Sequence, residues 1–554
     1  MDDVLTSMAV FWALMLLTYF LMQNGLSIFN DVSKSMGMFM LEKALGPGID
    51  LVEGRPGSAS KAWIMQGLLW LLAGSTLTFE GLWMMHDPLA LHSLSAWGYN
   101  PTSGSLLYAG NYAALYGGIG MLLIGAGLHI LPRLARTELA SEKNAALVSF
   151  LWTISVLVLV IGAHDSEVLG IKIIFVGTVM QVVALLAIIT NQLLTVSKRQ
   201  GALAIPGWLI IFGLLADPVA TVAVFVSGSV ETGVGQWLLG HMVGGTFFFA
   251  SAAGIALYTS SSASGNPLWS RSLAAAVLVG SIATINPMGD IDGRMAADML
   301  GLNFGGLIVT SEDNLVAAFL MALATIPIMA LAANVLITLR GGDAFVENAD
   351  SAGISELNLG ASMLLPLAIG SLFIQSDAFA AIPEFSGLAG TLMLMAIWLI
   401  LVPFSLGAAL HLFPIVTGRH LLSRNRARWA FWMMAGGAFL GLTVTMMADM
   451  IDMALIEATV EDSSSLSGEL RVVGAVLFYG TAVGAVMHSL NAVSGLFRGV
   501  KVDSVRDTSS SISPESYSLA SPTSVRRILA GGANLDTTVV PVGESDDAGS
   551  ATEL

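Results

Sequence analysis

QWLLGHMVGGTFFFASAAGIALY, residues 236–258, is the stretch on which the fold assignment of this chain depends. It is long enough to cross a bilayer as a helix, which takes about 20 predominantly apolar residues. It carries one histidine, His241, in its first third. A histidine inside a membrane costs free energy unless it is paired or bound to a metal or cofactor. The surroundings of this imidazole therefore bear directly on what the protein does.

The composition of the whole chain is that of a membrane protein. Of its 554 residues, 55% are hydrophobic and only 11% are charged, and the mean hydropathy is +0.77. A soluble domain has about 25% charged residues, so we expect a polytopic membrane protein with lipid as a partner. The absence of cysteine excludes disulfides, thiolate metal sites and cysteine nucleophiles. The formal net charge of −16 gives no sign of a nucleic-acid partner.

Apolar runs of about 20 residues predict an all-α bundle with thirteen transmembrane spans. The first span is additional to a set of about twelve. The predicted spans cover residues 4–23, 62–85, 106–130, 145–163, 168–194, 205–228, 235–258, 269–287, 313–338, 358–376, 388–412, 427–449 and 470–495.

The basic residues predict the orientation of the bundle. With the N-terminus outside, the inner segments and their borders hold 20 of the 23 Lys and Arg residues, and only Lys172, Arg294 and Arg471 lie on the outer side. Cytoplasmic loops of membrane proteins carry such an excess of positive charge. We therefore expect three parts: residues 1–60 as an N-terminal span with an inner loop, 61–498 as the bundle, and 499–554 as a Ser- and Thr-rich disordered cytoplasmic tail.

An internal repeat marks the third, seventh and eleventh spans. Their inner ends read Gly125-Ala-Gly-Leu-His129, Gly254-Ile-Ala-Leu-Tyr258 and Gly407-Ala-Ala-Leu-His411. Two of them continue as HILPRL and HLFPIV, where Pro132 and Pro414 are expected to end the helix. The equal interval of four spans predicts three pseudo-symmetric four-helix arcs.

This pattern resembles subunit I of the heme-copper oxidase superfamily, that is, cytochrome c oxidase subunit I, nearest the C-type (cbb) oxidases and the nitric oxide reductases. Residues 236–248 resemble the family's helix six, residues 162–168 the loop after helix three, and residues 404–432 the end of helix ten and the start of helix eleven. The resemblance covers roughly residues 60–498. It implies heme and copper as cofactors, aerobic electron transfer in a respiratory chain, and other respiratory-complex subunits as partners.

The family's chemistry uses six histidines, because imidazole nitrogen binds heme iron and copper. His241 matches the copper ligand of helix six and is the candidate metal ligand. The helix-two ligand falls at Gly110-Asn111, the helix-seven pair at Pro287-Met288-Gly289, and the helix-ten pair at Pro383 to Gly387 or at Leu392 and Leu394. Five of the six ligands are therefore absent at the matched positions, and no catalytic residue is assigned.

The other histidines have weaker assignments. His129 and His411 are expected to anchor span ends at the inner membrane surface, and His488 to face lipid headgroups or a partner subunit. On the outer side, His86, Asp87 and His92, together with His164, Asp165 and Glu167, would form a surface metal or proton-uptake site only if their loops meet.

Two functions remain open from the sequence. The first is an oxidase-like electron-transfer subunit that still binds heme or copper. The second is a paralogue that keeps the bundle without the cofactors, as a structural or assembly subunit or as a conduit for a small molecule or ion.

Overall fold

The structure is a computed structural model. It describes residues 3–23, 35, 37–39, 52, 54–164, 167–228, 238, 243–264, 266–284, 311–340, 352–375, 386–457 and 464–502. The predicted metal ligand His241, the segment 287–289 and the tail beyond residue 502 lie outside this part of the chain.

The protein is an all-α bundle, as the hydropathy pattern predicts, and the described residues contain eleven helices long and apolar enough to cross a membrane. Each of the thirteen predicted spans contains helix, including the one at 358–376. In chain order the helices are α1 (Asp3–Gln23), α3 (Ser58–Met84), η2 (His92–Trp97), α4 (Ser103–Tyr112), η3 (Ala113–Gly120), α5 (Met121–Leu134), α6 (Glu142–Gly162), α7 (Ile173–Ser197), α8 (Ile205–Ser227), η4 (Val243–Ala250), α10 (Ser251–Ser264), α11 (Arg271–Ala283), α13 (Ser311–Leu323), α14 (Thr325–Arg340), α15 (Ile354–Gln375), α16 (Ser386–Ala396), η7 (Ile397–Leu401), α17 (Val402–Thr417), α18 (Arg424–Glu457) and α19 (Ser464–Arg498).

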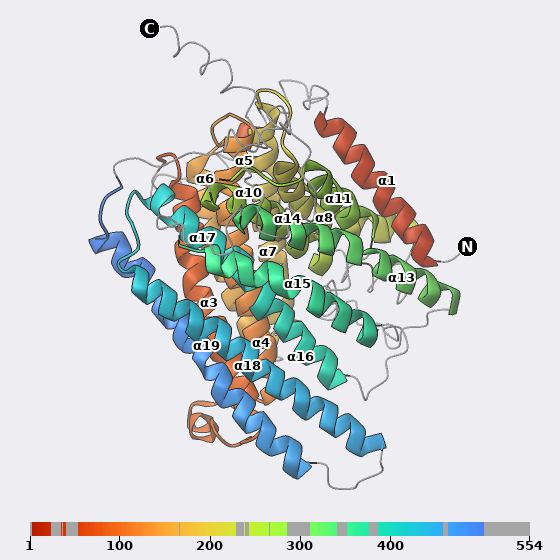
Figure 1. The fold of residues 1–554 in the computed structure, drawn as a ribbon, viewed down its shortest axis with the longest axis vertical. Coiled ribbons are helices and arrows are strands. Elements are labelled where there is room, and N and C mark those ends of the chain that lie inside the picture. Colours follow the sequence, from red (N-terminus) through yellow and green to blue (C-terminus); the bar gives the residue numbers. More distant parts are fainter. Residues whose placement is uncertain are drawn as a thin grey trace.

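The three spans that carry the repeat form the centre of the bundle. In the spans Ser103–Leu134 and Gly390–Thr417, 94% of the most apolar window is buried, against 56% or less in the other candidate spans. The repeat-bearing helices α5, α10 and α17 pack on one another in all three pairings. The remaining helices surround this core (Figure 1). The repeat therefore identifies the helices that are buried on all sides.

Each central span also contains one π-helical segment, directly before its repeat. These segments are η3, η4 and η7, and they lead into α5, α10 and α17 respectively. A π-helical turn inserts an extra residue into the helix, and such insertions are frequent at functional sites. The shared position of the three segments supports the three-part organisation that the sequence repeat predicts.

Glycines on the peripheral helix α3 allow it to pack closely against the central span α4–η3–α5. Gly67, Gly74 and Gly81 are spaced seven residues apart on α3. A methyl group added at Gly74 would lie only 2.7 Å from the backbone nitrogen of Ala114. Small residues allow such backbone approach between helices in lipid. The two spans are consequently in close contact over most of their length.

The additional N-terminal helix α1 packs on the outside of the bundle against α8, at one edge of the molecule (Figure 1). The Ser7 hydroxyl lies 3.2 Å from that of Ser227, and the Tyr19 ring centroid lies 5.0 Å from that of Trp208. These contacts make α1 antiparallel to α8, as the predicted span order requires.

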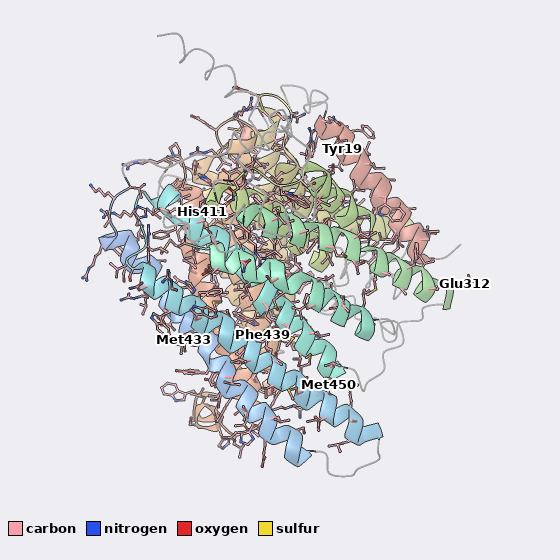
Figure 2. All side chains as sticks on the ribbon, in the orientation of Figure 1. Tyr19, Glu312, His411, Met433, Phe439 and Met450 are labelled. Carbon is pink, nitrogen blue, oxygen red and sulfur yellow. The ribbon has the colours of Figure 1, made fainter. Side chains whose placement is uncertain are left out.

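The side of α18 that faces away from the bundle carries exposed apolar residues, as expected of a surface that contacts lipid. Met433, Phe439 and Met450 lie on this helix (Figure 2) and are 37%, 43% and 54% exposed. Apolar side chains on the outside of a helical bundle match the hydrocarbon core of a bilayer.

Two local predictions need correction. Pro132 and Pro414 do not end their helices, because α5 continues to Leu134 and α17 to Thr417. A proline in the last turn disrupts little beyond its own missing hydrogen bond, so the helix finishes its turn. The predicted span 168–194 begins late, at Ile173, because residues 167–172 form a hairpin of β1 (Glu167–Val168) and β2 (Ile171–Lys172).

Candidate functional site

The helix-two position, where the resemblance implies an iron ligand, lies at the end of α4 and is closed by α3. A methyl group added at Gly110 would lie 2.6 Å from the Thr78 hydroxyl oxygen. Asn111 is 3% exposed, and its amide oxygen has no hydrogen-bond partner among the described residues. The protein ligands of heme iron are His, Cys, Met and Tyr side chains, and an amide oxygen is not among them. A bound water suits an orphaned amide oxygen better.

The helix-ten position is equally unsuited to iron. Leu392 and Leu394 lie on α16 and are 7% and 5% exposed. An aliphatic side chain offers no lone pair to a metal. At Asn111, Leu392 and Leu394 the side chains therefore do not fit a heme iron. The other helix-ten match, at Pro383 to Gly387, begins in residues 383–385, which lie outside the described residues. The copper ligands cannot be placed in the same way, because His241 and residues 287–289 lie outside the described residues.

Aromatic side chains join the central spans at the level of their π-helical segments. The Tyr116 ring of η3 lies 5.6 Å from the Phe248 ring of η4, and Tyr112 stacks on Tyr116 at 6.3 Å. Trp398 of η7 meets Phe478 of α19 edge to face, with ring centroids 5.7 Å apart. All five side chains are buried. Aromatic packing of this kind contributes dispersion and ring contacts to the core.

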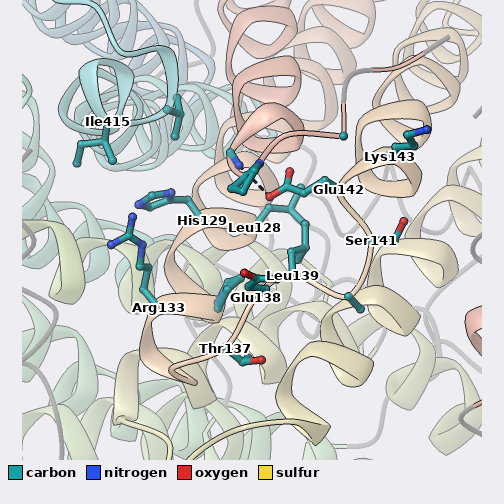
Figure 3. Close-up of a pocket in the computed structure, with 16 residues that line it drawn as sticks. Leu128, His129, Arg133, Thr137, Glu138, Leu139, Ser141, Glu142, Lys143 and Ile415 are labelled. Atoms are coloured by element: carbon teal, nitrogen blue, oxygen red, sulfur yellow. Dashed lines mark hydrogen bonds between the residues drawn. The ribbon is translucent and has the colours of Figure 1, made fainter. Parts of the chain in front are cut away.

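A pocket of about 640 Å³ opens at the end of the central spans where α5 and α17 finish (Figure 3). His129 and Arg133 of α5 line it, together with Ile415 of α17 and the segment 137–143 between α5 and α6. Its wall carries charges of both signs, from Glu138 and Glu142 and from Arg133 and Lys143. The pocket thus has no single preferred ligand charge.

Glu142 has a structural role in that wall. Its carboxylate accepts hydrogen bonds from the backbone N–H groups of Gly57 at 2.8 Å and Ala59 at 2.9 Å. These groups belong to the first turn of α3, whose N–H groups have no partner within the helix. A carboxylate there is also favoured by the helix dipole. Glu142, from the first turn of α6, therefore fixes the inner end of α3.

Three of the other histidines have different surroundings in the structure. His129 lines the pocket, and the His411 ring nitrogen lies 2.9 Å from the Ser262 hydroxyl of α10. His488 is 1% exposed. The expectation that it faces lipid headgroups or a partner subunit is wrong, because α19 turns this residue into the bundle.

The two loops that carry the predicted surface site contact each other at Tyr99 and His164. The Tyr99 hydroxyl lies 3.3 Å from His164 Nε2, with the rings edge to face at 5.2 Å. The described residues contain no group of three or more His, Asp and Glu side chains that could hold a metal ion. Asp165 of the predicted surface site lies outside them. Burial lowers the pKa of the His164 imidazole and raises the pKa of the Tyr99 phenol.

We expect the outer loop contact to weaken in acid. Because the folded-state pKa of His164 lies below its usual value of about 6.5, its contribution to stability is complete above that value. It is lost as the pH falls from there toward the folded-state pKa, since the unfolded chain then binds more protons. Melting temperatures of the purified protein measured over this range should fall with pH, and less so for His164→Gln.

The control for this prediction is Tyr99→Phe. It keeps the apolar ring against His164 and removes only the hydroxyl. Because desolvation causes the shift, Tyr99→Phe should retain the pH dependence of the wild type. The prediction is wrong if His164→Gln leaves that dependence unchanged.

These features define an integral membrane protein with a helical bundle around three interlocking central spans. The bundle has the fold of a heme-copper terminal oxidase. One such oxidase, solved as a dimer by cryo-electron microscopy, superposes with a TM-score of 0.58 and 12% identity, over 80% of this chain and 86% of that one. The resemblance seen in the sequence is thereby confirmed for the fold. No protein-family model and no curated protein matches the chain.

The sequence did not indicate that the ionisable residue Glu356 is buried. Glu356 falls in the predicted inner segment 339–357, one residue outside the predicted span at 358–376. In the structure α15 begins at Ile354, so Glu356 lies in its first turn and is 5% exposed. The hydropathy pattern left Glu356 outside the predicted span because its side chain is charged. Acidic residues are enriched in the first turn of helices, so Glu356 itself is a helix-start signal that would have included it.

Proposed function

We propose that this chain is a cytochrome c oxidase subunit I-like membrane protein of a respiratory complex that has lost the low-spin heme site. Residues 61–498 form the oxidase-like bundle in this proposal. The N-terminus lies outside and the tail lies in the cytoplasm, in keeping with the distribution of basic residues. Its role is that of a structural or assembly subunit beside a partner that carries the complete histidine set.

The observation that carries the proposal is the chemistry of the matched ligand positions. Asn111 and Leu394 are buried inside an oxidase-like bundle, so they occupy the interior where imidazoles are expected. At neither position does a side chain offer an iron ligand. Retention of the bundle without these ligands favours a supporting role over oxygen reduction by this chain alone.

A heme assay of the protein purified in detergent tests the proposal. We expect no low-spin heme band in the reduced-minus-oxidised spectrum and less than one heme per chain after extraction. Stoichiometric low-spin heme would overturn the proposal. Tyr112 and Met395 are buried near the matched positions and belong to residue types that ligate heme iron. Tyr112→Phe and Met395→Leu would then show whether either residue holds it.

Metal analysis of wild type and His241→Ala addresses the remaining candidate ligand separately. A single imidazole does not hold copper in competition with water, so both proteins are expected to be free of copper. Cross-linking in native membranes, followed by mass spectrometry, identifies the neighbours of the chain. The supporting-subunit role requires a heme-binding respiratory subunit among them, and its absence would contradict that role.

A further inference from the structure

Glu356 and His488 form a pair of buried ionisable groups inside the bundle. Glu356 lies in the first turn of α15, and His488 lies ten residues before the end of α19 at Arg498. His488 Nε2 and Glu356 Oε1 are 3.9 Å apart, and their side chains are 1% and 6% exposed. An ionisable residue within a transmembrane bundle is rare and costly, and is by default a candidate for function.

The backbone around both residues is held firmly by neighbouring helices. A methyl group added at Gly353, just before Glu356, would lie 2.1 Å from the Gly407 carbonyl oxygen of α17. Next to His488, the Ser489 hydroxyl donates to the Leu68 carbonyl oxygen of α3 at 3.0 Å. The pair therefore lies where α3, α15, α17 and α19 converge, with little freedom to close the gap between its members.

The separation of His488 Nε2 and Glu356 Oε1 indicates a bridging ligand between them. Neither ring nitrogen of His488 has a hydrogen-bond partner among the described residues. A separation of 3.9 Å is too long for a direct hydrogen bond. A buried polar group without a partner costs free energy, and a bridging water supplies one at little entropic cost.

The charges of the two groups are coupled by burial. A lone carboxylate or a lone imidazolium in the bundle interior carries the full desolvation penalty, whereas a pair with one proton has no net charge. The proton is either on the carboxyl group beside a neutral imidazole or on the imidazole beside a carboxylate. Both forms contain the same atoms and the same net charge.

We propose that Glu356 and His488 form a membrane-buried proton-binding site that holds one exchangeable proton and a bridging water. Gain of a second proton leaves the pair with charge +1, and loss of the first leaves it with charge −1. The site thus stores a proton in the bundle, whether or not the chain binds heme.

Other ionisable groups on the helices packed around the pair lie elsewhere on those helices. Among them, His411 lies 2.9 Å from the Ser262 hydroxyl, and Arg471 pairs with Asp449 and Asp452. The described groups are Lys61 and Glu80 of α3, His411 of α17, Arg424, Arg426, Arg428, Asp449 and Asp452 of α18, and Glu469, Arg471, Tyr479 and Arg498 of α19.

The test is whether the two residues titrate as one unit. Infrared difference spectra of the full-length protein, recorded after pH steps in H₂O and D₂O, report the carboxyl group of Glu356. Nitrogen NMR of ¹⁵N-histidine-labelled protein reports the ring of His488. Comparison with Glu356→Gln and His488→Gln assigns both signals.

We expect each substitution to change the proton affinity of the remaining partner by about tenfold or more, which is about one pKa unit. Glu80→Gln, which removes a partly buried carboxylate from α3, should leave both signals unchanged. Melting temperature and gel filtration establish that each variant is folded, and Glu356→Asp provides a second probe that keeps the carboxyl group. Independent titration of the two residues would overturn the proposal.

Discussion

Gly437→Ala is expected to destabilise the protein, whereas Gly436→Ala is expected to leave it at least as stable as the wild type. Both glycines lie in the interior of α18. A methyl group at Gly437 would lie 2.5 Å from the Thr481 backbone nitrogen of α19, but one at Gly436 would meet nothing within 4 Å. Backbone cannot move aside as a side chain can, so α18 and α19 would have to separate.

The expected cost at Gly437 is about 1–3 kcal/mol, as for other overpacked interiors. Alanine at Gly436 should contribute up to about 1 kcal/mol of stability, because it lowers the entropy of the unfolded helix segment. Melting temperatures of the two variants in the same detergent measure the difference. Equal melting temperatures would mean that the close approach of α18 and α19 is not maintained in the membrane protein as purified.

The sequence predicted the fold well because hydropathy and the repeat report on properties that the bilayer enforces. A helix that crosses lipid must form hydrogen bonds with all of its own backbone N–H and C=O groups. Its length and apolar composition can therefore be predicted from the sequence. The Gly125, Gly254 and Gly407 motifs predicted three related parts. That their spans are central is seen only in the structure, where close packing on every side requires small residues. The π-helical segments were not predictable, because they depend on how the three spans fit together.

The candidate site was only partly predictable. Counting from motifs matched Asn111 and Leu394 to ligand positions of the family, and both residues are buried. The partnership of Glu356 and His488 joins residues 132 positions apart in the chain (488 − 356), and no periodicity links them. Only the convergence of α15 and α19 brings them together. Sequence patterns report burial along one helix, but they do not report the pairing of two polar groups across helices.

Arg471→Met is the second substitution expected to have a large effect. Arg471 is one of three basic residues on the predicted outer side, and the structure explains this one. Its guanidinium lies 3.1 Å from Asp449 and also contacts Asp452, both on α18. Asp449 in turn accepts a hydrogen bond of 2.6 Å from the Thr391 hydroxyl of α16. Asp449 of α18 therefore connects α16, through Thr391, with α19, through Arg471.

Removal of Arg471 leaves Asp449 with a side chain only 9% exposed and without its counter-charge. Breaking a buried ion pair costs about 3–5 kcal/mol, and the lower value applies here because Arg471 itself is 25% exposed. We therefore expect Arg471→Met to lower stability by about 3 kcal/mol in denaturant or thermal unfolding. Arg471→Lys should recover part of this loss, since an ammonium group keeps the charge but does not reach both carboxylates in a fork.

The double variant Asp449→Asn with Arg471→Met distinguishes two costs. One is the loss of the ion pair, and the other is a buried Asp449 carboxylate left without its counter-charge. If the buried carboxylate causes most of the cost, the double variant should be more stable than Arg471→Met alone, and the two changes should not be additive. Asp452→Asn with Arg471→Met is the matched control, because Asp452 is 20% exposed and is better solvated once the arginine is gone. Rescue by neither asparagine would show that Arg471 stabilises the helices through its packing rather than through its charge. Equal rescue by both would show that the greater burial of Asp449 does not decide the cost.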